Sequence, residues 1–129
     1  MAKPGAKGLR RIVNATFYSM KGIKAGLINE AAFRQEAFLS VCMIIAAVFI
    51  AKDVVQFILL LLGPFLVMTV EILNSAIESV VDRIGNEYHE LSGRAKDMGS
   101  AAVFFMLIFT LISWLAIIDL NYLNWVFTK

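Results

Sequence analysis

The chain has 129 residues, of which 60% are hydrophobic and 17% are charged, and its mean hydropathy is +0.76. This composition excludes an ordinary soluble globular domain and is typical of an integral membrane protein. The net charge is only +2, and a single cysteine excludes a disulfide within the chain. The length suits one domain, so we expect a single membrane domain over residues 1–129.

The first predicted element is an amphipathic helix over residues 9–27. Its apolar residues recur at helical spacing, and its basic residues lie mostly between them. A basic amphipathic helix suits a membrane surface, where its cations lie near anionic head groups. The sequence leaves open whether this helix only anchors the chain or also forms a wall of a site.

A membrane-spanning helix is expected next, over about residues 30–51. Asn29 could cap this helix at its start. Glu30 and Arg34 lie four residues apart, so an ion pair on the helix surface is the simplest explanation for both. Lys52 and Asp53 then form a tight polar connection.

A second spanning helix is expected over residues 54–84. Its apolar part, residues 54–70, is roughly 26 Å long at 1.5 Å per residue, which suits a bilayer. Pro64 lies in the middle of this part and predicts a kink. A membrane helix tolerates such a proline when the freed backbone carbonyl finds another partner.

A polar seam emerges from the end of this second helix. At about 100° per residue, one helix face carries Glu71, Asn74, Ser75, Glu78 and Asp82. Six of the ten acidic residues of the chain fall within residues 71–97. Carboxylates at the end of a membrane helix are costly and usually face protein or water, so the seam is a candidate functional site.

The third spanning helix is predicted over residues 98–118. Gly85 is expected to end the second helix, and residues 86–93 are expected to form a polar connection. Small residues over 99–102 would permit close helix packing. Three aromatic residues suit the far membrane interface, namely Trp114, Tyr122 and Trp125.

The orientation follows from the charges. Seven of the twelve basic residues lie at or before Arg34, against one acidic residue, Glu30. The positive-inside rule therefore predicts a cytoplasmic N-terminus, with the connection after the second helix on the same side. The polar seam then lies at the cytoplasmic interface.

The residues of the seam limit the chemistry. The chain has no P-loop, no GxGxxG and no protein-kinase motif, and one Cys with one His gives no zinc spacing. Carboxylate and amide oxygens suit Mg²⁺ held together with substrate phosphates, and a carboxylate at the interface could act as a general base. Membrane carboxylates also build proton and cation pathways, or join helices by hydrogen bonds. The residues alone do not choose between an enzyme and a transporter.

Four blocks of sequence closely resemble the prokaryotic diacylglycerol kinase family. They read NEAAFRQ (residues 29–35), EILNSAIE (71–78), VVDRIG (80–85) and EYHELSGRAKDMGSAA (87–102), within a similarity that covers roughly residues 9–118. The resemblance implies an all-α homotrimer with three transmembrane helices and an N-terminal surface helix, in the bacterial inner membrane. It also implies transfer of the ATP γ-phosphate to diacylglycerol, giving phosphatidic acid. Relatives that phosphorylate undecaprenol share this architecture and remain the alternative. No nucleic-acid partner is expected.

The resemblance implies roles for individual residues. Glu71 looks like the general base, Asn74 like a residue that orients the site, and Glu30 and Glu78 like the ligands of Mg²⁺. The groups that would face ATP are Arg11, Tyr18, Glu30, Glu78, Glu87, Tyr88, His89, Lys96 and Asp97. Those that would face the lipid are Arg11, Ala15, Thr16, Phe17, Tyr18, Ser19, Met20, Ala32, Phe33, Arg34, Gln35, Glu36, Glu71, Ser100 and Trp114. The chain departs from the best-known members at Met20, Phe57 and Pro64, and the last could alter helix bending.

Overall fold

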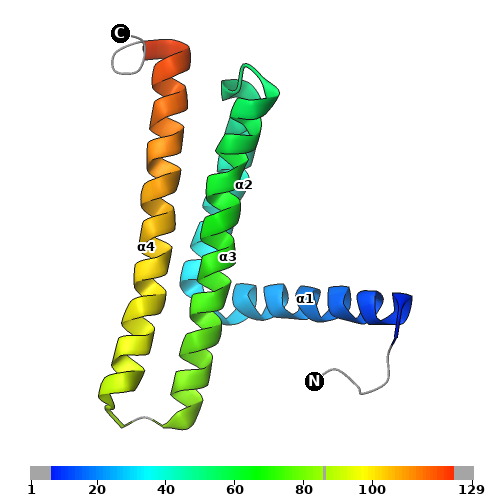
Figure 1. Ribbon diagram of the computed structural model, residues 1–129, viewed down its shortest axis with the longest axis vertical. Coiled ribbons are helices and arrows are strands. Elements are labelled where there is room, and N and C mark those ends of the chain that lie inside the picture. Colours follow the sequence, from blue (N-terminus) through cyan, green and yellow to red (C-terminus); the bar gives the residue numbers. More distant parts are fainter. Residues whose placement is uncertain (1–6, 86, 124–129) are drawn as a thin grey trace.

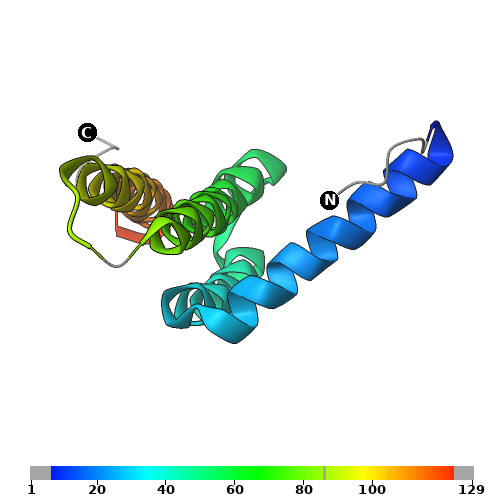
Figure 2. The ribbon, with the colours of Figure 1, turned by 90° about the horizontal axis from the view of Figure 1, so that it is seen from below.

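The computed structural model describes residues 7–85 and 87–123, and every regular element in this part is a helix. The elements are α1 (Leu9–Asn29), α2 (Ala31–Ile50), α3 (Val54–Ile84), α4 (Glu90–Ile118) and the π-helical turn η1 (Asp119–Leu123). Three long helices run side by side, and α3 packs against both α2 and α4. Helix α1 runs crosswise to this bundle and meets it at its C-terminal end (Figures 1 and 2).

The three long helices are each long and apolar enough to cross a membrane. Large apolar side chains cover their outer surface and are well exposed in the single chain, for example Phe38, Phe49 and Val54. Such a surface suits hydrocarbon, not water. The predicted fold class, an all-helical membrane protein with three membrane helices, is confirmed.

The ends of the helices agree with the sequence except in two places. Helix α1 continues two residues beyond the predicted end at Leu27. Helix α4 begins at Glu90, so the predicted polar connection over residues 86–93 is wrong in its second half. The prediction counted apolar residues, which mark only the part of a helix that lies in hydrocarbon. His89 caps the polar extension, because its Nδ1 accepts a hydrogen bond from the Leu91 N–H at 3.2 Å. Gly85 ends α3, as predicted.

The corner between α1 and α2 is formed by packing and not by the predicted cap. Asn29 is the last residue of α1, and its Nδ2 donates to the Ala25 carbonyl at 2.9 Å. Glu30 takes the N-cap position of α2 with extended backbone. Gly26 lies against the Phe33 ring so closely that a Cβ there would be 3.0 Å from the ring. This contact fixes the angle at which α1 leaves the bundle.

Arg34 also holds this corner. Its Nη1 donates to the carbonyl oxygens of Leu27 and Ile28, at 3.2 and 3.0 Å. The last carbonyls of α1 have no partner inside their own helix, so the guanidinium satisfies them. Arg34 therefore binds these carbonyls and does not form the ion pair expected with Glu30. The Glu30 carboxylate remains available to the pocket described below.

Helix α3 runs through Pro64 as one element. Proline has no N–H, so the carbonyl of Leu60, four residues earlier, lacks its helical donor. The indole Nε1 of Trp114 on α4 donates to this carbonyl at 3.1 Å. The partner that the sequence required for the freed carbonyl is thus a side chain from the neighbouring helix, and this contact directs the Trp114 N–H into the bundle and not toward the far interface.

Helices α3 and α4 approach each other closely at Gly63, the residue before Pro64. A Cβ on Gly63 would lie 2.7 Å from Thr110 Oγ1, which is too close for any side chain to be added without movement. The small residue therefore brings the two backbones near enough for the Trp114 bond.

A polar network joins the far end of the bundle. Asn121 Nδ2 donates to the Ile50 carbonyl at 2.9 Å and to Gln56 Oε1 at 2.8 Å, and Lys52 Nζ donates to the Asn121 carbonyl at 2.6 Å. Asp53 Oδ1 accepts from the Gln56 N–H and caps α3. This places the 51–53 connection and η1 at the same end of the molecule (Figure 1). Trp125, expected at the same interface, lies outside the described residues.

Candidate active site

A pocket of about 380 Å³, the polar pocket, lies among α2, α3 and α4 near the corner with α1. Four of the five residues of the predicted seam line it together. Its lining residues are Glu30, Ala32, Glu36, Glu71, Asn74, Ser75, Glu78, Ser100, Val103, Phe104 and Leu107. Asp82, the fifth residue of the seam, lies one turn further along α3, where it pairs with Lys96 on α4.

Four carboxylates face this one pocket, from the α1–α2 corner, α2 and α3. Glu71 is the most buried of them, with 6% of its surface exposed. Asn74 Nδ2 donates to Glu78 Oε1 at 3.1 Å and so holds that carboxylate in place. Several carboxylates that face one pocket favour a bound cation, because their charges repel each other when no cation is present.

The Asn74 amide oxygen is buried and has no hydrogen-bond partner within the part of the chain that the structure describes. Gly99 on α4 makes room for it, since a Cβ at Gly99 would overlap Asn74 Oδ1. A buried polar atom without a partner is rare in a folded protein and calls for a ligand, an ion or a water molecule. The position of Asn74 among carboxylates makes its oxygen a candidate hard ligand.

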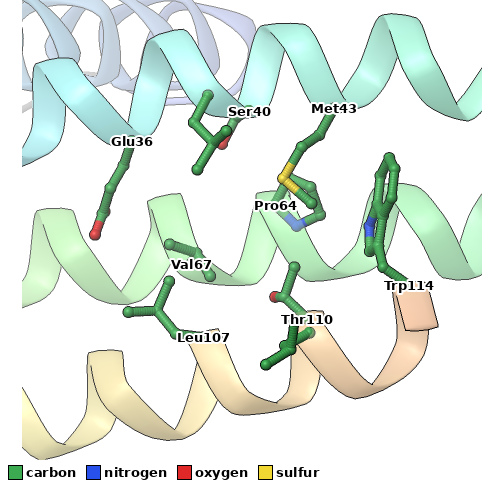
Figure 3. A pocket seen from close by; sticks show the side chains of 10 residues that line it. Glu36, Ser40, Met43, Pro64, Val67, Leu107, Thr110 and Trp114 are labelled. Atoms are coloured by element: carbon green, nitrogen blue, oxygen red, sulfur yellow. The ribbon is translucent and has the colours of Figure 1, made fainter. Parts of the chain in front are cut away.

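A second pocket, the apolar pocket, adjoins the first. It has a volume of about 240 Å³ and shares Glu36 and Leu107 with the polar pocket. Its other lining residues are Leu39, Ser40, Met43, Pro64, Val67, Thr110, Leu111 and Trp114. Figure 3 shows Glu36 at one end and the Trp114 indole at the other. The predicted lipid-facing residues Glu36 and Trp114 therefore line one cavity. Glu36 Oε2 is buried and has no hydrogen-bond partner among the described residues.

A third pocket, the loop pocket, lies where α3 and α4 are joined, and has a volume of about 270 Å³. It gathers four of the residues predicted to face the nucleotide. These are Glu87, Tyr88, His89 and Lys96. The ion pair of Lys96 with Asp82 crosses from α4 to α3 beside it. Asp97 is exposed on α4 and does not line this pocket.

Other predicted residues are not brought to these pockets in the single chain. Arg11 and Tyr18 are exposed on α1, as is the 15–20 segment assigned to the lipid. Helix α1 points away from the bundle (Figure 2), and Arg11 lies 18 residues before Asn29, roughly 27 Å along the helix axis. Phe33 and Arg34 belong to the α1–α2 corner, and Gln35 is exposed.

Sequence reasoning missed the walls of the apolar pocket, such as Met43, Val67 and Thr110. An apolar residue in a membrane helix faces lipid, core or cavity with the same residue type, so no sequence signal separates the three. Among the described residues, no group of three or more His, Cys, Asp or Glu is arranged to hold a metal ion. A metal in the polar pocket would need further ligands from a substrate.

The fold and the pockets define a class: a three-helix membrane protein in which a carboxylate-lined pocket adjoins an apolar one. The family model for prokaryotic diacylglycerol kinase matches residues 17–118. The chain is 56% identical over 107 residues to the diacylglycerol kinase of Escherichia coli K12, covering 83% of this chain and 88% of that protein. It is 50% identical to the diacylglycerol kinase of Haemophilus influenzae (83% and 91% covered) and 46% identical to that of Helicobacter pylori 26695 (86% and 87%). The chain therefore belongs to the prokaryotic diacylglycerol kinase family, which confirms the resemblance.

The contact of Gly99 with Asn74 gives a testable expectation. Gly99→Ala should destabilise the protein by about 1–3 kcal/mol, as overpacking of a tight contact does. It should also reduce turnover, because Asn74 must move. Adding Asn74→Ala removes the overlapping atom, so Gly99→Ala should cost less stability in that background, while turnover stays low. Unfolding in detergent and a turnover assay measure the two effects.

Gly93→Ala is the matched control, since a Cβ at Gly93 on the same helix would have no atom within 4 Å. This change should leave stability equal or raise it slightly. A Gly99→Ala protein as stable and as active as the parent would show that the contact with Asn74 does not position the site.

Proposed function

We propose that this protein transfers the γ-phosphate of ATP to the free hydroxyl of diacylglycerol and produces phosphatidic acid. The supporting observation is the position of Glu71, which lies one helical turn beyond Val67 on the same face of α3. Val67 lines the apolar pocket and Glu71 the polar one, so a lipid with its chain in the first would present its hydroxyl to the second. The relatives named above, each a diacylglycerol kinase, support the same substrate.

Glu71 is proposed as the general base. Its carboxylate takes the proton of the lipid hydroxyl as the hydroxyl oxygen forms a bond to the γ-phosphorus, and the bond from that phosphorus to the β-phosphate oxygen breaks to release ADP. Phosphoryl transfer needs positioning and charge stabilisation more than covalent chemistry, so a nearly buried carboxylate beside the acceptor suffices.

Glu30 and Glu78 are proposed to hold Mg²⁺ together with the ATP phosphates. Both line the polar pocket, Asn74 orients Glu78, and the partnerless Asn74 oxygen adds a further hard donor. Mg²⁺ is typically bound by one or two carboxylates plus substrate phosphates, so this donor set fits. When bound, Mg²⁺ would neutralise the charge of the β- and γ-phosphates. The absence of a larger ligand cluster among the described residues agrees with an ion that arrives with the nucleotide.

The remaining nucleotide contacts are proposed to come from the loop pocket and from a neighbouring chain. Lys96 and the 87–89 segment line the loop pocket, whose Asp82 lies one helical turn beyond Glu78 of the polar pocket. Arg11 and Tyr18 lie on α1, which leads away from the pockets of its own chain, so they would act on the site of another copy. We propose a homotrimer with shared sites, placed in the bacterial inner membrane with α1 on the cytoplasmic surface. The basic residues before Arg34 support this orientation.

Glu71→Gln keeps the size and hydrogen bonding of the side chain but removes the base. Turnover of diacylglycerol with ATP should fall about 10²–10⁴-fold, the usual loss for one general base. The matched control is Glu90→Gln, because Glu90 is exposed at the start of α4 and should be dispensable. Offering the parent protein undecaprenol in parallel separates the two lipid substrates, and phosphorylation of neither would restore the transporter alternative. Near-parental turnover by folded Glu71→Gln would reject the base.

Glu30→Gln and Glu78→Gln should each raise the Mg²⁺ concentration needed for half-maximal turnover, because one charged oxygen ligand is lost. The same shift should appear in Mg²⁺-dependent nucleotide binding, which does not require turnover. Glu90→Gln again serves as the control. Magnesium titrations of both variants that overlay the parent curve would assign these residues a structural role.

Shared sites can be tested by mixing inactive subunits. If Arg11 serves the site of a neighbour, a mixture of Arg11→Ala and Glu71→Gln chains contains some sites with both groups intact, and part of the activity should return. Mixing Glu71→Gln with Glu78→Gln is the control without rescue, because both residues line one pocket of one chain. No rescue with Arg11→Ala, together with an active monomer in detergent, would refute the shared-site trimer.

A further inference from the structure

We propose that Pro64 and Trp114 together set the length of acyl chain that the apolar pocket accepts. Pro64 leaves the Leu60 carbonyl without a helical donor, and that carbonyl holds the Trp114 indole across one end of the pocket. The pocket ends at the indole, so the proline in α3 would act on lipid selection through a residue on α4. This inference rests on the proposed function, because it takes the occupant of the pocket to be the lipid substrate.

The geometry of the pocket supports this role for the indole. Figure 3 shows the cavity running from Glu36 to Trp114, with Val67, Pro64 and Thr110 along its length. From Glu36 to Met43 on its α2 wall is seven residues, roughly 10 Å along the helix. Glu36 lies at the end of the apolar pocket that adjoins the polar pocket, and the indole of Trp114 lies at the opposite end. A chain that enters beside Glu36 therefore reaches the indole after a limited number of methylene groups.

The hydrogen bond is what keeps the indole in this place. Leu60 and Pro64 are both fully buried, so the carbonyl lies in the interior of the bundle. A buried carbonyl without a partner is strongly disfavoured, so swinging the indole away from Leu60 is opposed. With any other residue at position 64, its N–H would satisfy the carbonyl within α3, so that the carbonyl would no longer depend on the indole as its donor.

Pro64→Val tests the inference, because valine supplies the N–H while keeping apolar bulk at the pocket wall. Measured with dihexanoyl-, dioctanoyl-, didecanoyl- and dioleoylglycerol, the ratio of kcat/KM for long over short chains should rise on the order of tenfold, as for roughly two more buried methylenes. The change should lie in KM, with kcat for the shortest lipid near that of the parent. Val67→Ala is the control, since it widens the pocket and leaves the hydrogen bond intact. It should raise KM for all chain lengths alike.

Two further measurements exclude simple enlargement of the pocket. Trp114→Phe removes the N–H donor and should shift the ratio in the same direction, and the double variant with Pro64→Val should shift it no further, because both act through one contact. If the two substitutions enlarged the pocket independently, their effects on the chain-length ratio would instead multiply. In a Trp125→Phe background Trp114 is the only tryptophan of the chain, and Pro64→Val should lower its fluorescence anisotropy as the indole becomes mobile.

Unchanged anisotropy in Pro64→Val would overturn the anchoring of the indole. An unchanged chain-length ratio in an active, folded Pro64→Val protein would overturn the role in lipid selection. Failure of the proposed function looks different, because the parent protein itself would then phosphorylate none of the diacylglycerols. Anisotropy does not depend on activity and tests the anchor even in that case. If Pro64→Val does not fold, Trp114→Phe and its chain-length ratio decide the question.

Discussion

A buried polar group in this bundle must find its partner within the protein or in a bound ligand, because the hydrocarbon of a bilayer offers none. The contact between Trp114 and the Leu60 carbonyl shows how strictly this holds. A proline in a membrane helix frees one carbonyl, and a side chain from the adjacent helix supplies the missing donor. At the far end, Asn121 and Gln56 satisfy each other and the last carbonyl of α2. The bundle is thus held together by a few directed bonds within apolar packing.

The same constraint picks out the site. In the described part of the chain, two buried side-chain atoms lack a hydrogen-bond partner, Glu36 Oε2 and Asn74 Oδ1. Both residues line the pockets, Glu36 at the junction with the apolar cavity and Asn74 among the carboxylates. Elsewhere in the bundle such atoms are satisfied, so their presence here is compatible with a site that is completed by ligands. Packing depends on this arrangement, because a Cβ at position 99 would overlap the Asn74 amide oxygen.

Much of this could be derived from the sequence, because a membrane restricts the choices. Helical periodicity and apolar length gave α2 and α3 nearly to the residue, and the 3.6-residue period placed Glu71, Asn74, Ser75 and Glu78 on one face. The start of α4 was misplaced, since apolar content ends where the bilayer ends and the helix does not. The presence of Pro64 in the sequence shows that the Leu60 carbonyl needs a donor from elsewhere. The sequence does not show which residue supplies it. It depends on the register of α4 against α3, which Gly63 and Thr110 set by contact.

The direction of α1 decides what one chain can do alone. The Gly26–Phe33 contact and the bonds of Arg34 fix α1 away from the bundle, so the groups near its start are held roughly 27 Å along the helix from the corner beside the polar pocket. A corner held this firmly does not swing α1 back over its own pocket. The bundle also exposes the apolar faces of all its helices, and the carboxylates of its pocket are open on one side in the single chain. Carboxylates facing hydrocarbon are costly, and the proposed homotrimer would cover that side with another copy of the chain. In the homotrimer that we propose, this corner is the feature that would let α1 of one subunit complete the site of the next.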